Sequence, residues 1–160
     1  MSLITLQFVL GADWSSKLIS WYGQGYGGYS HVDAVLSDST LLGARSDKVG
    51  GQPPGVQIRP PNYEKWSRRC IVTLAGTQAL QPQWETFLRS QVGLPYDKAD
   101  IIGLIIGRPL MSQGHWICSA LQTAALHLVT LFPDMPETPQ QVPPNMLLFG
   151  VLAIGGKVSS

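Results

Sequence analysis

The segment HVDAVLSDSTLLGAR, residues 31–45, predicts a β-hairpin and with it the class of the fold. Branched and apolar residues flank Asp38 and Ser39, and an Asp–Ser pair between two such runs is typical of a tight turn. Similar patterns predict strands over residues 3–10, 56–60 and 70–76. The first half of the chain is therefore expected to be mostly antiparallel sheet.

Helical spacing of apolar residues dominates the second half. Residues 81–93 place Trp84 and Leu88 on one face and reach a stop at Gly93, and residues 116–132 form the longest helical pattern, closed by Pro133. Further helices are expected over residues 12–22 and at the end of residues 94–108, with a proline-rich surface loop over residues 133–146 and a last strand or short helix over residues 149–156. The fold class is α+β.

The length of the chain indicates the number of domains, and its charge indicates which partners are not expected. The 160 residues fit a single domain, 1–160, and the net charge of +1 provides no field for a polyanion, so nucleic acid is not expected as a partner. Charged residues make up only 13% of the chain, about half the usual share, which leaves apolar surface for contact with a larger assembly.

Apolar runs in this sequence are too short to cross a bilayer, which takes about 20 residues. The N-terminal segment MSLITLQFVLGADW lacks the basic region of a signal peptide and resembles a first strand. We therefore expect no membrane span and no signal peptide, and synthesis in the cytoplasm.

Cys118 stands at the beginning of the longest predicted helix. The positive end of the helix dipole and the unpaired amides there lower the pKa of a thiol, and the same amides can hold the oxyanion of an acyl-transfer reaction. The alternative is a small apolar residue that packs the helix into the core. Cys70, within a predicted strand, is expected to be a buried structural thiol.

Three histidines could serve such a nucleophile as its base. His31 begins a predicted strand, where most histidines are structural, whereas His115 precedes Cys118 by three residues and His127 lies well inside the helix. The spacing of these residues does not match the ligand pairs of zinc sites, and we expect neither a metal nor a cofactor.

Five fragments in order resemble one family: YSHVDAVL (29–36), GVQIR (55–59), GLPYDKAD (93–100), WICSALQTAA (116–125) and TPQQVPPNML (138–147). They resemble the circularly permuted branch of the NlpC-type papain-like cysteine peptidases, which includes YiiX-like proteins and, more distantly, the lecithin retinol acyltransferase group. The order of histidine before cysteine is the mark of the permutation. The resemblance implies a papain-like antiparallel sheet packed against the helix that carries the cysteine.

Carried over to this chain, the resemblance implies Cys118 as the nucleophile, His31 as the general base, and Tyr96 and Asp97 as residues that shape the site. The family's third member, a polar residue that orients the imidazole, would fall near Gly43 or Ala44, which have no polar side chain. Gln57 on the following strand and Asp33, on the same strand face as His31, are the two substitutes. Gln113 is a candidate oxyanion donor by analogy with papain-like enzymes.

Several functions stay open on these residues. The first is a cysteine hydrolase that cleaves an amide bond, with peptidoglycan stem peptides as the substrate that the bacterial and phage members of the superfamily imply. The second is a catalytically silent adaptor of a phage tail or baseplate, incorporated in the virion; the missing third residue favours it. The third function is an acyltransferase or thioesterase that acts on lipid or ester substrates. The fourth is a module that binds wall peptides without cutting them.

Overall fold

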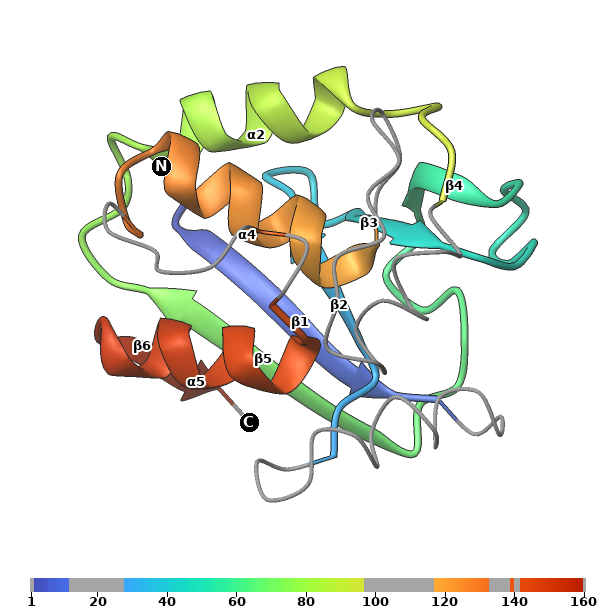
Figure 1. Cartoon of the computed structure of the whole chain (residues 1–160), viewed down its shortest axis with the longest axis horizontal. Coiled ribbons are helices and arrows are strands. Elements are labelled where there is room, and N and C mark those ends of the chain that lie inside the picture. Colours follow the sequence, from blue (N-terminus) through green and yellow to red (C-terminus); the bar gives the residue numbers. More distant parts are fainter. Residues whose placement is uncertain (1, 12–27, 97–116, 133–138, 140–141, 160) are drawn as a thin grey trace.

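A computed structural model describes residues 2–11, 28–96, 117–132, 139 and 142–159. Within these residues the protein is an α+β fold with one antiparallel sheet of six strands and three helices (Figure 1). The strands are β1 (Ile4–Leu10), β2 (His31–Val35), β3 (Leu41–Arg45), β4 (Gly55–Arg59), β5 (Arg68–Leu74) and β6 (Gly156–Ser159). Their order across the sheet is β4-β3-β2-β1-β5-β6.

The predicted hairpin is confirmed. β2 and β3 pair in antiparallel register, and the Leu36 N–H donates to the Thr40 carbonyl at the turn. Ser39 takes a left-handed conformation with φ of 66°, and the Asp38 carboxylate accepts a hydrogen bond from the Thr40 N–H, so both predicted turn residues shape the reversal. The sheet grows outward from this hairpin, with β1 at its centre.

The helices α2 (Gln81–Ser90), α4 (Cys118–Leu128) and α5 (Pro144–Ala153) lie on one side of the sheet. α4 packs on β2 and β3, α2 packs on α4, and α5 packs on β5 and β6 (Figure 1). Alternate residues of the strands face these helices and are fully or nearly fully buried there: Ile4, Leu6, Phe8, Val32, Ala34, Leu42, Ala44, Val72 and Leu74. The helices contribute Trp84, Leu88, Leu121, Ala125 and Leu126 to the same core.

Element ends differ from the sequence expectations in three places. α2 ends at Ser90, before the expected stop at Gly93, and α4 ends at Leu128, before Pro133. α5 begins at Pro144, inside the segment expected to be loop, because Pro143 and Pro144 take the N-cap and first helical positions, where a missing N–H costs nothing. β6 then continues the chain along β5.

Other expectations fall on residues that the structure leaves out of its description. The helix over residues 12–22 and the apolar helix after residue 97 lie outside the described residues. Across the described part of the chain, no helix combines the length and the apolar character that a membrane crossing needs.

Candidate active site

Cys118 is the first residue of α4 and is buried, with 6% of its surface exposed. The N-cap residue, Ile117, has an extended backbone and makes no side-chain capping bond. The amides of the first helical turn are therefore not capped by the N-cap side chain, and the positive end of the helix dipole lies at the thiol. This local structure favours a thiolate at position 118 and an anion bound beside it.

α4 meets the sheet where β2 and β3 separate. The registered pairs of the two strands are Ala34 with Leu42 and Val35 with Leu41, so the first residues of β2 are not paired with β3. The Val32 N–H donates a hydrogen bond to the Cys118 thiolate, and one helical turn later the Gln122 amide donates to the Leu42 carbonyl at 3.0 Å. The separation of the strands leaves Val32 unpaired with β3 and able to contact Cys118, while Gln122 ties α4 to the paired part of β3.

His31, the first residue of β2, lies against this thiol. Its side chain is 10% exposed, and it is hydrogen-bonded both to Cys118 and to Asp33, two residues along the same strand. The bond to Asp33 joins Nε2 and Oδ1 over 2.8 Å. Since Nε2 is taken by the carboxylate, Nδ1 is the ring nitrogen left for the thiol, and one imidazole bridges Cys118 and Asp33.

The charges of these three groups support one another. Burial alone would lower the pKa of His31, but the negative charges of Asp33 and Cys118 outweigh it and raise that pKa to about 9. Burial alone would raise the pKa of Cys118, but the His31 cation and the hydrogen bonds from His31 and Val32 lower it below the ordinary value of a thiol. Both shifts favour the charged forms, so the site favours a thiolate at Cys118 paired with an imidazolium at His31.

The position of Asp33 explains why the expected third member is absent from β3. Its carboxylate, on a side chain that is 1% exposed, occupies the space beside Gly43, and a Cβ atom at position 43 would collide with Oδ1. A side chain on β3 and a carboxylate at position 33 exclude each other here. Burial raises the pKa of Asp33, but the His31 cation, the Tyr63 hydroxyl and Arg59 together lower it below its usual range, so the carboxylate is ionised.

Of the other site residues that the sequence suggests, two are described in the structure and three are not. Gln57 pairs with Gly43 across β3 and β4, yet among the described residues the side-chain hydrogen bonds of His31 go to Asp33 and Cys118. Tyr96 is half-buried and packs against the core. Asp97, Gln113 and His115 lie outside the described residues.

The other residues singled out in the sequence lie away from the site. His127 is exposed near the end of α4, where its Nδ1 bonds to the Phe132 carbonyl. Cys70 lies in a strand, β5, as predicted, but it is half-buried rather than buried; it is a free thiol that is hydrogen-bonded to Tyr29.

Tyr63 is a site residue that sequence reasoning misses. Its hydroxyl donates to Oδ2 of Asp33 at 2.9 Å across a separation of thirty residues. It lies in the segment PPNYEKW (60–66) between β4 and β5, which carries no periodic pattern and no motif that would place it near a histidine. A contact of this kind depends on how the loop folds back on the sheet.

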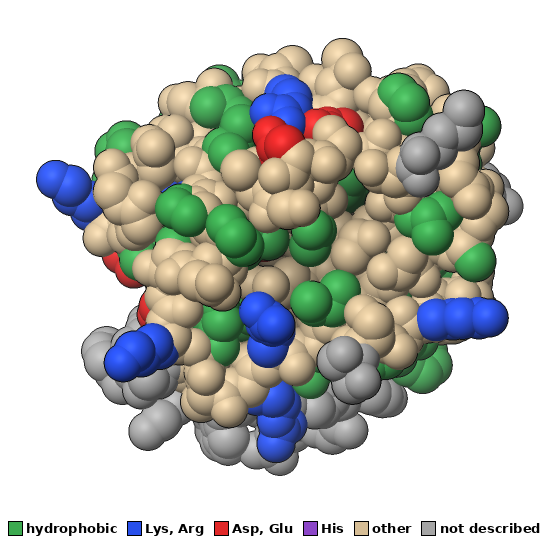
Figure 2. Space-filling view, turned by 180° about the vertical axis from the view of Figure 1, so that it is seen from behind, with side chains coloured by type: hydrophobic (Ala, Val, Ile, Leu, Met, Phe, Trp, Pro, Cys, Tyr) green, Lys and Arg blue, Asp and Glu red, His purple; other side chains and the backbone are tan. Residues whose placement is uncertain are grey.

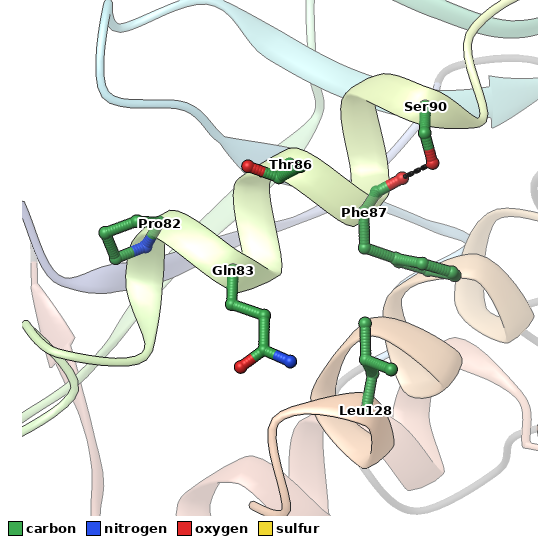
Figure 3. Close-up of a pocket in the computed structure, with 6 residues that line it drawn as sticks. All are labelled: Pro82, Gln83, Thr86, Phe87, Ser90 and Leu128. Carbon is green, nitrogen blue, oxygen red and sulfur yellow. Dashed lines mark hydrogen bonds between the residues drawn. The ribbon is translucent and has the colours of Figure 1, made fainter.

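A surface groove lies between α2 and the end of α4, away from Cys118 (Figure 3). It has a volume of about 450 Å³ and is lined by Pro82, Gln83, Thr86, Phe87, Ser90 and Leu128. Leu128 is the last residue of α4, about 15 Å along the helix from its first residue. This groove is therefore not the place where Cys118 would meet a substrate.

Charged side chains are scattered over the face of the molecule that Figure 2 shows. On the side of the molecule that faces away in Figure 1, the Lys and Arg side chains of the described residues are spaced apart and form no continuous basic surface (Figure 2). Within the described ranges, no group of three or more His, Cys, Asp or Glu side chains is arranged to hold a metal ion. Comparisons of the sequence with protein-family models and with curated proteins find no match.

Proposed function

We propose that this protein is a cysteine hydrolase that cleaves an amide bond through a thioester at Cys118. The observation that carries the proposal is the buried chain of hydrogen bonds from Cys118 through His31 to Asp33, at the start of a helix. Nucleophile, base and orienting group are the three parts that such catalysis needs. We further propose that the domain is a circularly permuted, papain-like member of the NlpC type, because the sequence motifs resemble that branch.

Each residue has a defined task in the reaction. The Cys118 thiolate attacks the carbonyl carbon and forms the C–S bond, while amides at the start of α4 stabilise the oxyanion. The His31 imidazolium gives its proton to the leaving nitrogen as the C–N bond breaks, which leaves a thioester and a free amine. His31 then takes a proton from water, the hydroxide attacks the thioester, and the C–S bond breaks to release the acid and restore the thiolate.

The proposed substrate is the stem peptide of peptidoglycan. The family resemblance supports this choice, since its bacterial and phage members act on wall peptides, and the net charge of +1 provides no field that would draw a polyanion. The proposed setting is the bacterial wall, reached as part of a phage tail or baseplate assembly.

The contact between Asp33 and His31 argues against the hypothesis of a catalytically silent adaptor. The absence of a polar residue at positions 43 and 44 is the main argument for an inactive scaffold, and the 2.8 Å bond from His31 to Asp33 supplies an orienting carboxylate in its place. An orienting partner fixes the tautomer and the direction of the imidazole, which is the task of a third catalytic member.

Digestion of purified peptidoglycan tests the proposal. Wild type should release soluble peptides with new amino and carboxyl ends, measured by mass spectrometry, and Cys118→Ala should release none. Cys70→Ala is the matched control, because it removes the other thiol of the chain and should retain activity. Equal release by wild type and Cys118→Ala would refute the hydrolase; turnover of acyl esters but not of wall peptides would refute the substrate and assign the site to ester chemistry.

A further inference from the structure

The Asp33 carboxylate is held on both of its oxygens by side chains from different segments. Oδ1 bonds to His31 at 2.8 Å and Oδ2 accepts the Tyr63 hydroxyl at 2.9 Å. A carboxylate fixed at one oxygen alone can still rotate about its last side-chain torsion, which is broad. A second, opposed hydrogen bond removes that freedom.

Tyr63 is itself fixed by its surroundings. The indole of Trp66 meets its ring edge-on, with centroids 5.1 Å apart, and the guanidinium groups of Arg45 and Arg59 each lie 5.7 Å from the ring centroid. Arg45 is anchored in turn by ion pairs to Asp47 and Glu64 at 2.8 and 2.7 Å. Two cations over one aromatic ring and an edge contact leave the phenol little room to move.

The second cation also ties the ring to the strand beside Asp33. Arg59 is 1% exposed, and its guanidinium donates to the Gly43 carbonyl at 3.0 Å. Gly43 is the residue whose missing side chain makes room for the Asp33 carboxylate. Burial and the charge of Asp33 both raise the pKa of Tyr63, so the phenol keeps its proton and can only donate toward the carboxylate.

We propose that Tyr63 is a positioning residue that holds the Asp33 carboxylate so that Oδ1 stays on Nε2 of His31. Arg45, Arg59 and Trp66 support Tyr63 in this task. The inference rests on the proposed function, because it adds to the candidate triad a fourth residue from a loop that none of the sequence motifs covers. Tyr63 touches no reacting atom and acts only through Asp33.

Proton NMR of the imidazole N–H tests this without any substrate. An Nε2–H bonded to a buried carboxylate gives a far-downfield signal, which Asp33→Asn should abolish and thereby assign. In Tyr63→Phe, which removes the hydroxyl alone, the signal should move upfield and broaden, and alkylation of Cys118 at pH 6 should slow by about tenfold. Tyr29→Phe is the matched control, because it removes a phenol hydroxyl that bonds to Cys70, and it should leave both readings at the wild-type level.

Other results would overturn the inference. An unchanged signal in Tyr63→Phe means that Asp33 holds His31 unaided, and a signal that moves further downfield means that Tyr63 only competes for the carboxylate charge. If Tyr63→Phe does not fold, Trp66→Phe, which keeps the hydroxyl and alters the edge contact, should give a smaller upfield shift, and no shift there would also overturn it. A wild type with the signal but no hydrolysis would sink the proposed function alone, and an active wild type indifferent to Tyr63→Phe would sink this inference alone.

Discussion

Replacing Asp33 with Asn removes the charge that holds His31 protonated and leaves the size of the side chain unchanged. The pKa of His31 lies at about 9 against an ordinary value of 6.5, a difference worth about 3 kcal/mol. Of the two charges that raise it, that of Asp33 contributes more than that of Cys118, while burial opposes both. In Asp33→Asn the pKa of His31 should therefore fall most of the way back to 6.5 or below it.

The sign of the pH dependence follows from the direction of that shift. A raised pKa means that the imidazolium is present below about pH 9 and is lost as the pH rises through that value. In Asp33→Asn the loss should occur at lower pH, so that at pH 8 the imidazole is neutral and Cys118 regains its proton. Activity at pH 8 should then fall by at least tenfold, and much less at pH 5.5.

Titration of the imidazole carbon-bound protons by NMR measures this pKa directly. Asp38→Asn is the matched control, because it removes an exposed carboxylate of the β2–β3 turn and should leave His31 unchanged. A His31 pKa that stays at about 9 in Asp33→Asn would refute the electrostatic account of the site. A wild-type pKa near 6.5 would refute it as well.

Three further substitutions test the framework around the site. Gly43→Ala drives a Cβ into the Asp33 carboxylate, and it should cost about 1–3 kcal/mol in urea unfolding and lower the pKa of His31; an unchanged pKa would show that Asp33 has room to spare. Glu85→Gln should lower the free energy of unfolding in urea by about 2 kcal/mol, because both oxygens of this buried carboxylate accept hydrogen bonds from Ser37. Burial raises the pKa of Glu85, but these bonds and Arg89 lower it below its ordinary value, so the stabilisation should be present above pH 4.5 and fade as the pH falls. A cost that does not change with pH would contradict this. Leu121→Ala, on the buried face of α4, should cost about 2–5 kcal/mol by the same measurement, and a cost under 1 kcal/mol would mean that α4 is not part of the core.

Local patterns account for the elements that the sequence predicts well. The hairpin of β2 and β3 and the helix that begins at Cys118 follow from alternation, turn residues and helical spacing over neighbouring residues. The start of α5 escapes prediction because its prolines suggest loop, although they stand where a helix tolerates them; its second half falls within the strand or short helix expected over residues 149–156. β6 has too few residues for a pattern of its own and is defined by its pairing with β5.

In the site, too, a contact between residues close in the sequence is predictable, whereas a contact between residues far apart in the sequence is not. Asp33 is within reach of sequence reasoning because residues two apart share a strand face, and the structure brings it to His31. The choice between Asp33 and Gln57 needs the space beside Gly43, which depends on how two strands separate around the start of α4. The contact of Tyr63 with Asp33 is set by a loop that folds back over the sheet, and a single sequence carries no signal for it.

The central claim is that Cys118 is an activated thiolate held by His31. The most direct test is the rate at which iodoacetamide alkylates Cys118 at pH 6, followed by mass spectrometry of the labelled peptide, with Cys70 of the same chain as the internal reference, since burial raises its pKa. An ordinary thiol has a pKa of about 8.5 and is almost wholly protonated at that pH. The account predicts labelling of Cys118 at least tenfold faster than Cys70 and a loss of that advantage in His31→Ala; a Cys118 that labels no faster than Cys70, or that is indifferent to His31→Ala, would contradict it.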